Sequence, residues 1–413
     1  MGLSKTSLNP SNGIFKLLTF LEKINRNYSE HLMIIALQLL LLLLIGSSVF
    51  FYTWCAISTG RFFATNKQEL SASCQPVSVL IPVCGVDEGA RENWDSFCQQ
   101  DYEHYEVLFG VMSPQDPAIP VLEEVIARFP DRAKLIFCLE VHGINHQISN
   151  LIHLLDAAQH EIVILTNSDM YVKSEYLRTV TAPLADPEIG IVTCGYLGHD
   201  PKFLPAALAS LGRCIDFIPS VLVAISLEGG LRFALGATVA TRKLVLDKLG
   251  GLESVVNRIG SDYHIGNMVA DAGYRVELSQ YIVETDAGSE SFGQLFQREL
   301  RWARTSRWNR GFLYYGYMYV FGTVYCIPLL LLSGAHHWAL IVCLTTVAIR
   351  IVQSLVSIYS MGCPKLLRWL WALPIRDLMS FVIWVAGAFG QTIHWRGRRL
   401  EVGVGGVLTT PNP

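Results

Sequence analysis

Residues 77–87 read VSVLIPVCGVD, a run of seven mostly apolar residues followed by a glycine turn and an aspartate. Because four of the first seven residues are β-branched, the run predicts a buried strand over 77–83. Similar short runs recur at residues 105–111, 134–139 and 162–166. Helical stretches separate them at residues 88–99, 120–129 and 147–158. Strands that alternate with helices imply βαβ crossovers, which predicts an α/β fold with a mainly parallel sheet.

Acidic residues that follow these strands are the first candidate site, because ligands of a parallel sheet bind beyond the carboxyl ends of its strands. Asp87 follows the first strand, and it either caps the next helix or faces a ligand. Asp169 follows the fourth strand, and Ser174 is a nearer cap for the helix after it. A carboxylate at this position suits a divalent cation that is shared with a substrate phosphate.

A third aspartate lies further along the chain. Asp262 falls in the first turn of a helix predicted over residues 262–272. An aspartate in that place either complements the helix dipole or acts on a ligand, and the residue alone does not distinguish the two.

Residues 291–310 read SFGQLFQRELRWARTSRWNR, with an arginine at every third position from Arg298 to Arg310. Three residues advance an α-helix by about 300°, so these arginines spiral around the helix and form no single stripe. One interpretation is an interfacial helix with snorkelling arginines and tryptophan anchors. The other is that Arg298, Arg301 and Trp302 close over a diphosphate, and both can hold together.

The composition places part of the chain in a membrane. Of 413 residues, 51% are hydrophobic and 16% are charged, with a net charge of −3. Soluble domains average about 25% charged residues, and without a basic excess a nucleic-acid partner is excluded. Residues 32–57 carry no charge and exceed the roughly 20 apolar residues that cross a bilayer as a helix. Further spans are predicted at residues 311–334, 338–361 and 375–395, with an interfacial helix at 364–374.

The candidate residues occur in the order of a known signature. Three aspartates, Asp87, Asp169 and Asp262, precede Arg298-Glu299-Leu300-Arg301-Trp302. This order resembles the D, D, D, (Q/R)xxRW signature of the inverting family 2-like glycosyltransferases. The chain is similar in particular to the ceramide glucosyltransferase group of family 21 and to the bacterial hopanoid-associated glycosyltransferases. The resemblance covers roughly residues 32–400 and includes residues 85–87, 101–108, 143–145, 233–238 and 395–399.

The resemblance implies a GT-A (Rossmann-like) domain that binds a nucleotide-diphosphate sugar, with UDP-glucose favoured. Asp87 would hold the nucleotide base or ribose, and Asp169 a divalent metal, Mg²⁺ or Mn²⁺, that bridges the diphosphate. Asn145 and Gly236 would belong to the same nucleotide-sugar site. Asn167 stands where relatives usually have an acidic residue, so its carbonyl can ligate the metal but adds no charge.

The resemblance also implies the catalytic roles. Asp262 would be the general base for the acceptor hydroxyl, while Arg298, Arg301 and Trp302 would stabilise the leaving diphosphate. One base without a covalent nucleophile predicts inversion at the anomeric carbon. Because Asn167 adds no charge, the metal dependence is expected to be weaker. Relatives commonly carry a lysine where this chain has Gln147, which removes a possible phosphate contact, and a catalytically impaired member is an alternative.

A lipid hydroxyl is the expected acceptor, on ceramide, a hopanoid or diacylglycerol, because the arginine-rich helix runs directly into a predicted span. The expected protein is a multi-pass membrane protein with a cytosolic catalytic domain. Arginines at residues 396, 398 and 399 favour a cytosolic C-terminus and a re-entrant final segment. Arg350, inside a predicted span, is either a packing or a functional residue. The rivals are a processive polysaccharide synthase and a non-enzymatic membrane protein.

These boundaries divide the chain into six predicted parts. They are an N-terminal tail (1–31), a transmembrane helix (32–57), the GT-A domain (58–290), the RxxRW interfacial helix (291–310), C-terminal transmembrane or re-entrant helices (311–395) and a C-terminal tail (396–413).

Overall fold

The computed structural model describes residues 10–65, 75–286 and 290–410. Internal contacts divide the chain into two compact units. The larger unit, residues 52–317 and 350–413, contains the β-sheets and all the candidate site residues. The smaller unit, residues 1–51 and 318–349, is helical where it is described.

An eight-stranded sheet runs through the larger unit in the order β3-β2-β1-β4-β7-β6-β8-β5. Its strands are β1 (Val77–Val83), β2 (Tyr105–Val111), β3 (Ala133–Phe137), β4 (Ile162–Leu165), β5 (Met170–Tyr171), β6 (Ile189–His199), β7 (Val239–Arg242) and β8 (Arg275–Asp286). The strands β1 to β4 are parallel to one another, as predicted. The other half is mixed, since β7 is antiparallel to β4 and β6, β8 is parallel to β6, and β5 is antiparallel to β8.

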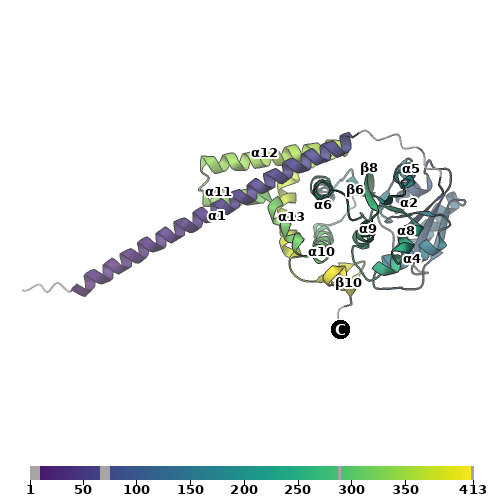
Figure 1. Ribbon diagram of the computed structural model, residues 1–413, viewed down its shortest axis with the longest axis horizontal. Helices are drawn as coiled ribbons and strands as arrows, with labels where there is room; N and C mark the ends of the chain where they lie inside the picture. Colours follow the sequence, from purple (N-terminus) through teal and green to yellow (C-terminus); the bar gives the residue numbers. More distant parts are fainter. Residues whose placement is uncertain (1–9, 66–74, 287–289, 411–413) are drawn as a thin grey trace, which may run out of the picture. The chain divides into compact units, whose positions relative to one another are not determined.

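Helices cover both faces of this sheet (Figure 1). One face packs against α2 (Ala90–Cys98), α3 (Ile119–Arg128) and α5 (Tyr176–Thr181). The other packs against α4 (His146–Ala157), α8 (Lys243–Lys248), η3 (Leu252–Val255) and α9 (Ser261–Asp271). The short turn η1 (Ala182–Ala185) follows α5. Because both faces are covered, every residue of β1 and β2 is buried, which explains the near-continuous apolar runs of these strands.

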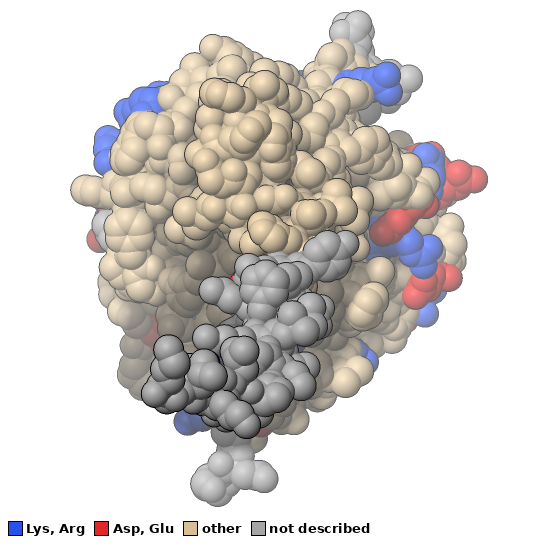
Figure 2. Space-filling view, turned by 90° about the vertical axis from the view of Figure 1, so that its left-hand side faces the viewer, with Lys and Arg blue, Asp and Glu red and all other residues tan. Residues whose placement is uncertain are grey.

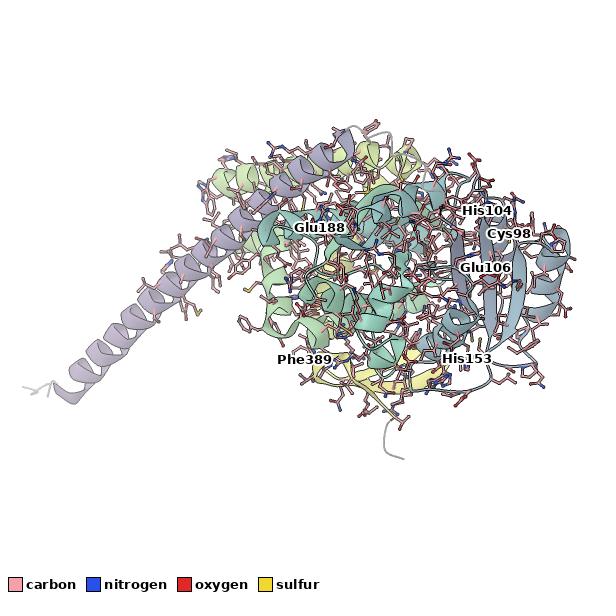
Figure 3. The ribbon with its side chains drawn as sticks, turned by 45° about the vertical axis from the view of Figure 1, so that its right-hand side comes forward. Cys98, His104, Glu106, His153, Glu188 and Phe389 are labelled. Atoms are coloured by element: carbon pink, nitrogen blue, oxygen red, sulfur yellow. The ribbon has the colours of Figure 1, made fainter. Side chains whose placement is uncertain are left out.

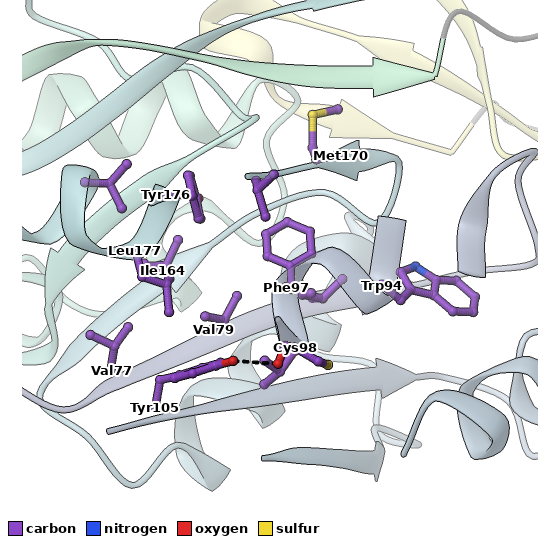
Figure 4. Packing of buried hydrophobic residues seen from close by; sticks show 14 of the residues in the cluster. Val77, Val79, Trp94, Phe97, Cys98, Tyr105, Ile164, Met170, Tyr176 and Leu177 are labelled. Carbon is purple, nitrogen blue, oxygen red and sulfur yellow. Dashed lines mark hydrogen bonds between the residues drawn. The ribbon is translucent and has the colours of Figure 1, made fainter. Parts of the chain in front are cut away.

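The core between the sheet and α2 is aromatic (Figure 4). Trp94 and Phe97 of α2 are almost fully buried, and Tyr105 on β2 donates a hydrogen bond to the carbonyl of Cys98 at 2.6 Å. Glu106, also on β2, is buried but accepts hydrogen bonds from Ser78 and Lys134 (Figure 3). The Tyr105 hydroxyl and the Glu106 carboxylate are therefore paired, as burial requires.

A second group of helices in the larger unit packs around a separate apolar core. It comprises α6 (Leu204–Leu211), the π-helical turn η2 (Gly212–Phe217), α7 (Ile218–Glu228), α10 (Phe292–Arg310), η5 (Pro364–Ala372) and α13 (Leu373–Gly387). A capping box starts α10, because Ser291 and Gln294 hydrogen-bond to each other's backbone N–H groups. The predicted helices at residues 262–272 and 291–310 are confirmed as α9 and α10.

The last described residues form a small antiparallel sheet where the sequence predicts a tail from residue 396. Its strands are β9 (Thr392–Trp395), β10 (Arg398–Val402) and β11 (Leu408–Thr409), with the short turn η6 (Val404–Gly406) between the last two. Arg396 and Gly397 connect β9 to β10 with positive φ angles of 45° and 76°. Such a two-residue turn matches the twist of a hairpin. Buried Ile393, Leu400 and Val402 then give the segment a core of its own.

Four helices are long and apolar enough to cross a membrane. They are Ser29–Ala64 within α1 (Pro10–Ala64), Leu204–Glu228, His337–Ser360 (α12) and Pro364–Gly387. The segment Leu204–Glu228 is unpredicted and largely buried in the protein. The predicted span at 311–334 is broken into η4 (Gly311–Val320) and α11 (Gly322–Leu332), and the predicted span at 375–395 ends as a helix at Gly387.

The smaller unit holds the described N-terminal part of α1 together with α11 and most of α12. Ser48 of α1 donates to the carbonyl of Tyr319 at 2.8 Å, and Gln38 donates to that of Leu332 at 3.0 Å. Large apolar side chains of α12 remain exposed, at residues 340, 341, 344 and 347. Figure 2 shows one face of the molecule on which uncharged side chains far outnumber Lys, Arg, Asp and Glu.

Candidate active site

Asp87 lies in the loop after β1, where a second aspartate fixes the backbone. Gly85 has a φ of 75°, and its N–H donates to the Asp116 carboxylate at 3.0 Å. The Asp87 carboxylate accepts two hydrogen bonds from Arg396, at 3.1 and 3.0 Å. A bidentate pair of this kind joins the first strand loop to the C-terminal hairpin, which the sequence assigns to a tail.

Asp169 lies in the loop after β4, on a rigid support. Trp94 donates to the carbonyl of Ser168 at 3.1 Å, and Thr285 of β8 donates to the carbonyl of Asp169 at 2.9 Å. Burial raises the pKa of the Asp169 carboxyl, and the neighbouring Asp87 raises it further. Among the residues that the structure describes, the Asp169 carboxylate has no ion-pair partner.

The two departures from the family pattern contact each other. Gln147 Nε2 donates to Asn167 Oδ1 at 2.8 Å, so a neutral hydrogen bond stands where relatives have charged residues. Asn145, two residues before Gln147, caps α4: its side chain accepts from Ile148 N–H at 3.3 Å and donates to the carbonyl of Arg258 at 2.8 Å. Asn145 is 1% exposed, so its amide serves the fold at this position.

Asp262 is the second residue of α9, and Gly236 lies against it. The backbone N–H groups of Tyr263 and Gly236 donate to its carboxylate, yet burial has the larger effect and raises the pKa of Asp262. A Cβ atom on Gly236 would come within 3.1 Å of Asp262 Oδ2. Gly266 lets α9 approach closely, because a Cβ there would overlap the backbone of Phe233 and Ala234. The glycines thus bring the predicted segment 233–238 to the carboxylate.

The arginine-rich helix α10 presents its motif residues to the same region. Arg298 pairs with Glu290 at 2.7 Å, and its guanidinium lies 5.3 Å from the centre of the Trp302 ring. Arg301 lies 5.9 Å from the ring of Trp395, next to the hairpin turn, and has no acidic partner among the described residues. Arg301 is therefore a cation available to a ligand.

The same helix clamps the C-terminal hairpin. Arg304 donates to the carbonyls of Thr392 and Phe389 (Figure 3), and Arg307 donates to those of Ala388 and Gly390. The spiral of arginines thus has two tasks. Arg298 and Arg301 serve the site, whereas Arg304 and Arg307 satisfy the backbone of the segment that leads into β9.

Three residues join this region for which the sequence predicted no role in the site. Tyr196 on β6 is an electrostatic neighbour of Asp169 and Asp262. Arg213 in η2 stacks over the Tyr196 ring at 4.9 Å. Arg396 is the third. The sequence carries a signal for Arg213, because an isolated arginine within an apolar helix marks function, but none for Tyr196. We call the following nine residues the donor site: Asp87, Asp169, Tyr196, Arg213, Asp262, Arg298, Arg301, Trp302 and Arg396.

A second set of charges lies buried on the other side of α10's motif, and we call it the buried charge cluster. It consists of Asp216, Glu299, Arg350, Arg376 and Asp377. Arg350 pairs with Asp216 at 2.5 Å and with Asp377 at 2.7 Å. Arg376 pairs with both oxygens of Glu299, at 2.6 and 2.9 Å. These ion pairs favour the predicted packing role of Arg350. Asp377 pairs with Arg350, and Arg376 pairs with Glu299.

The charges of the donor site and its surroundings allow a divalent cation. No three His, Cys, Asp or Glu side chains gather anywhere in the described chain. Magnesium, however, is commonly held by one or two carboxylates together with substrate phosphates. The Asp169 carboxylate, half-buried near Asp87 and without an ion-pair partner among the described residues, fits that arrangement. Asn167 fits it less well, because its oxygen already accepts the Gln147 hydrogen bond.

Two known proteins are similar to this chain in sequence. Ceramide glucosyltransferase 1 of Caenorhabditis elegans is 23% identical over 359 residues, which cover 84% of this chain and 75% of that protein. Ceramide glucosyltransferase 3 of the same organism is 25% identical over 263 residues, which cover 60% of this chain. The match spans about half, 54%, of the length of that second relative.

A solved structure shares the fold. The mannosyltransferase PcManGT from Pyrobaculum calidifontis, in complex with GDP-Man and Mn²⁺, aligns with a TM-score of 0.50 at 17% identity. The alignment covers 86% of this chain and 97% of that one. The larger unit thus has a GT-A-like fold, as the sequence predicts. Residues 40–408 match the model of glycosyl transferase family 21, so the chain belongs to this family and is a glycosyltransferase.

Proposed function

We propose that the protein is a membrane-bound inverting glycosyltransferase that moves a hexose, with glucose favoured, from a UDP-sugar to a lipid hydroxyl. Relatives named as ceramide glucosyltransferases support a lipid acceptor of the ceramide class. The GT-A-like relative that binds GDP-Man and Mn²⁺ supports a nucleotide-sugar donor. Hopanoids and diacylglycerol offer the same hydroxyl chemistry at a membrane.

The observation that carries this proposal is the environment of Asp262. Its half-buried carboxylate at the start of α9 has no cationic partner among the described residues, and burial raises its pKa. A carboxylate of this kind is a stronger base than an exposed one and accepts the proton of the acceptor hydroxyl as that oxygen attacks the anomeric carbon. A single base with in-line attack gives inversion.

The leaving diphosphate is the other half of the reaction. Asp169 would hold a divalent cation there, and that cation would neutralise negative charge on the phosphates. Arg301, which has no carboxylate partner among the described residues, and Arg298, which packs on Trp302, supply further positive charge. This charge would stabilise the negative charge that grows on the leaving diphosphate. Asp87, at the edge of the site, would bind the base or ribose of the nucleotide.

The placement of the acceptor follows from the helices. The described part of the chain has four helices that are long and apolar enough to span a membrane, and α10 leads directly into apolar η4. Nucleotide sugars are cytosolic, so we propose that the catalytic domain faces the cytosol. The acceptor hydroxyl would then reach Asp262 from the membrane surface.

The test is UDP release by membranes that contain the full-length protein, given UDP-glucose, UDP-galactose or UDP-N-acetylglucosamine. Each donor is combined with ceramide, a hopanoid, diacylglycerol or no lipid. We expect release that depends on one of the lipids. Asp262→Asn should reduce the rate by about 10²–10⁴-fold, because it removes the base.

Asp271→Asn is the matched control, since Asp271 ends the same helix α9 but lies exposed and paired with Arg232. It should retain the activity. Turnover that is independent of lipid, or normal turnover of Asp262→Asn, would contradict the proposal.

A further inference from the structure

Arg213 is a buried cation that forms no ion pair with any described residue, although it acts electrostatically on the nearby carboxyls of Asp169 and Glu290. It is 8% exposed, within the apolar segment Leu204–Glu228. It makes no hydrogen bond or ion pair with any residue that the structure describes, and its Nε atom is buried without a partner. An arginine in this state is costly, because the desolvation of a charge is normally offset by a carboxylate or by carbonyls.

Aromatic rings hold the Arg213 side chain in place. Its guanidinium lies 4.9 Å from the ring centre of Tyr196 and 5.7 Å from that of Trp302. Stacking of a planar guanidinium fixes its orientation and leaves the N–H groups at its edge unused. Those groups are therefore preorganised for an acceptor that the chain itself lacks.

The backbone around Arg213 is specialised as well. Arg213 lies in the π-helical turn η2, and such turns occur frequently at functional sites. Gly212, just before it, packs on the guanidinium of Arg376, since a Cβ there would meet this group at 2.3–2.6 Å. Asp216, further along η2, pairs with Arg350. The buried charge cluster thus fixes the turn that presents Arg213.

The charges that remain after pairing indicate the ligand. Arg396 is neutralised by Asp87, and Arg298 by Glu290. Arg213 and Arg301 are then the donor-site cations without a carboxylate partner. A nucleotide diphosphate-sugar carries two negative charges on its phosphates, which two unpaired arginines match.

We propose that Arg213 is a donor-binding residue whose guanidinium contacts the diphosphate of the sugar nucleotide. This inference rests on the proposed function, since it needs a nucleotide-diphosphate donor. It extends the phosphate-binding set beyond α10 to η2, on a segment separated from the RxxRW motif by more than seventy residues.

The experiment uses the full-length protein in detergent micelles with MnCl₂, and it measures the affinities for UDP, GDP and uridine and the melting temperature without nucleotide. Arg213→Met keeps the length and apolar packing of the side chain. We expect it to weaken binding of the preferred nucleoside diphosphate at least tenfold, to leave uridine binding unchanged and to leave the melting temperature equal or higher. Arg213→Lys, which keeps the charge but not the planar fork, should lose less affinity.

Arg242→Met is the matched control, because Arg242 donates to the carbonyls of Leu184, Pro187 and Ile189 and so serves the fold. It should lower the melting temperature and keep the UDP affinity of the folded fraction. The inference is wrong and the proposed function stands if Arg213→Met binds UDP or GDP as tightly as the wild type. The same holds if its uridine affinity and its melting temperature both fall. If the wild type binds neither UDP nor GDP, the proposed donor class fails, and this inference fails with it.

Discussion

The buried charge cluster and the donor site are both built from arginines and carboxylates, and α10 contributes to each. In the cluster, Arg376 meets both oxygens of Glu299, and Arg350 meets two aspartates. In the donor site, Asp169, Asp262, Arg213 and Arg301 lack such partners among the described residues, although Asp87 pairs with Arg396 and Arg298 with Glu290. One set is completed by the chain itself, whereas the other is completed only by a ligand.

The difference separates stability from function within one helix. Glu299 lies between Arg298 and Arg301 in sequence, yet it points into the cluster while they serve the donor site. Removing a charge from the cluster leaves its partner buried and alone, which destabilises the fold. Removing a charge from the donor site relieves an existing imbalance and impairs only what the site does.

The largest effect is expected in the cluster. Arg376→Met leaves the Glu299 carboxylate buried without its partner and should cost about 3–5 kcal/mol of unfolding free energy. Chemical unfolding in detergent micelles measures this loss. Arg232→Gln, at an exposed ion pair with Asp271, is the control and should cost less than about 1 kcal/mol. The double variant Arg376→Met/Glu299→Met should recover most of the loss, and if it is as unstable as the single variant, the pair is not what the cluster depends on.

Asp169→Asn should show the reverse pattern. It removes a buried carboxylate whose pKa is raised by burial and by Asp87, so the melting temperature should stay equal or rise. The rate of sugar transfer should fall by about 100-fold, or roughly 2.7 kcal/mol of barrier. Transfer assays and thermal unfolding of the same preparation test both halves. A variant that unfolds more easily would remove the distinction between the two regions.

The pH dependence follows from Asp262. As a base it acts when deprotonated, so the rate falls as the pH drops through its pKa, and burial raises that pKa. An ordinary aspartate has a pKa of about 3.9. The acid limb of kcat/KM should therefore lie at a higher pH than this value. Asp271→Asn should not move this limb. A limb in the ordinary range would contradict the raised pKa.

The smallest effect is expected at the neutral pair. Asn167→Asp restores a second carboxylate near Asp169 and should strengthen Mn²⁺ binding severalfold, measured by calorimetry in the presence of UDP. Gln147→Glu tests the contact between Gln147 and Asn167 from the other side. This variant should weaken Mn²⁺ binding if Asn167 lies beside the metal. An unchanged Mn²⁺ affinity in Asn167→Asp would show that Asn167 does not serve the metal.

Much of the fold follows from local pattern. The apolar runs at β1, β2 and β4 and the helices between them were predictable because strands buried on both faces need continuous apolar sequence. The positions of Asp87 and Asp169 followed from where those strands end, and that of Asp262 from the start of a predicted helix. The antiparallel strand β7 and the long β8 were not predicted, since mixed pairing depends on contacts distant in sequence.

The rest of the site could not be read locally. Nothing near Tyr196 distinguishes it from a packing tyrosine, and Asp216 gains its meaning only from Arg350, more than a hundred residues away. The predicted tail became a hairpin because its few apolar residues pack on each other and its backbone is held by α10. Asn145, predicted for the nucleotide-sugar site, also caps α4, a role that the motif alone did not indicate.

The pairing of Asp87 with Arg396 has a consequence for biosynthesis. These two residues lie 309 positions apart, near the first strand and near the end of the described chain. During translation the aspartate is exposed long before the arginine has been made. The nucleotide pocket therefore cannot assume its final charge until the last hairpin emerges from the ribosome, and a chain that terminates early would carry all three aspartates and the RxxRW helix yet lack a finished site.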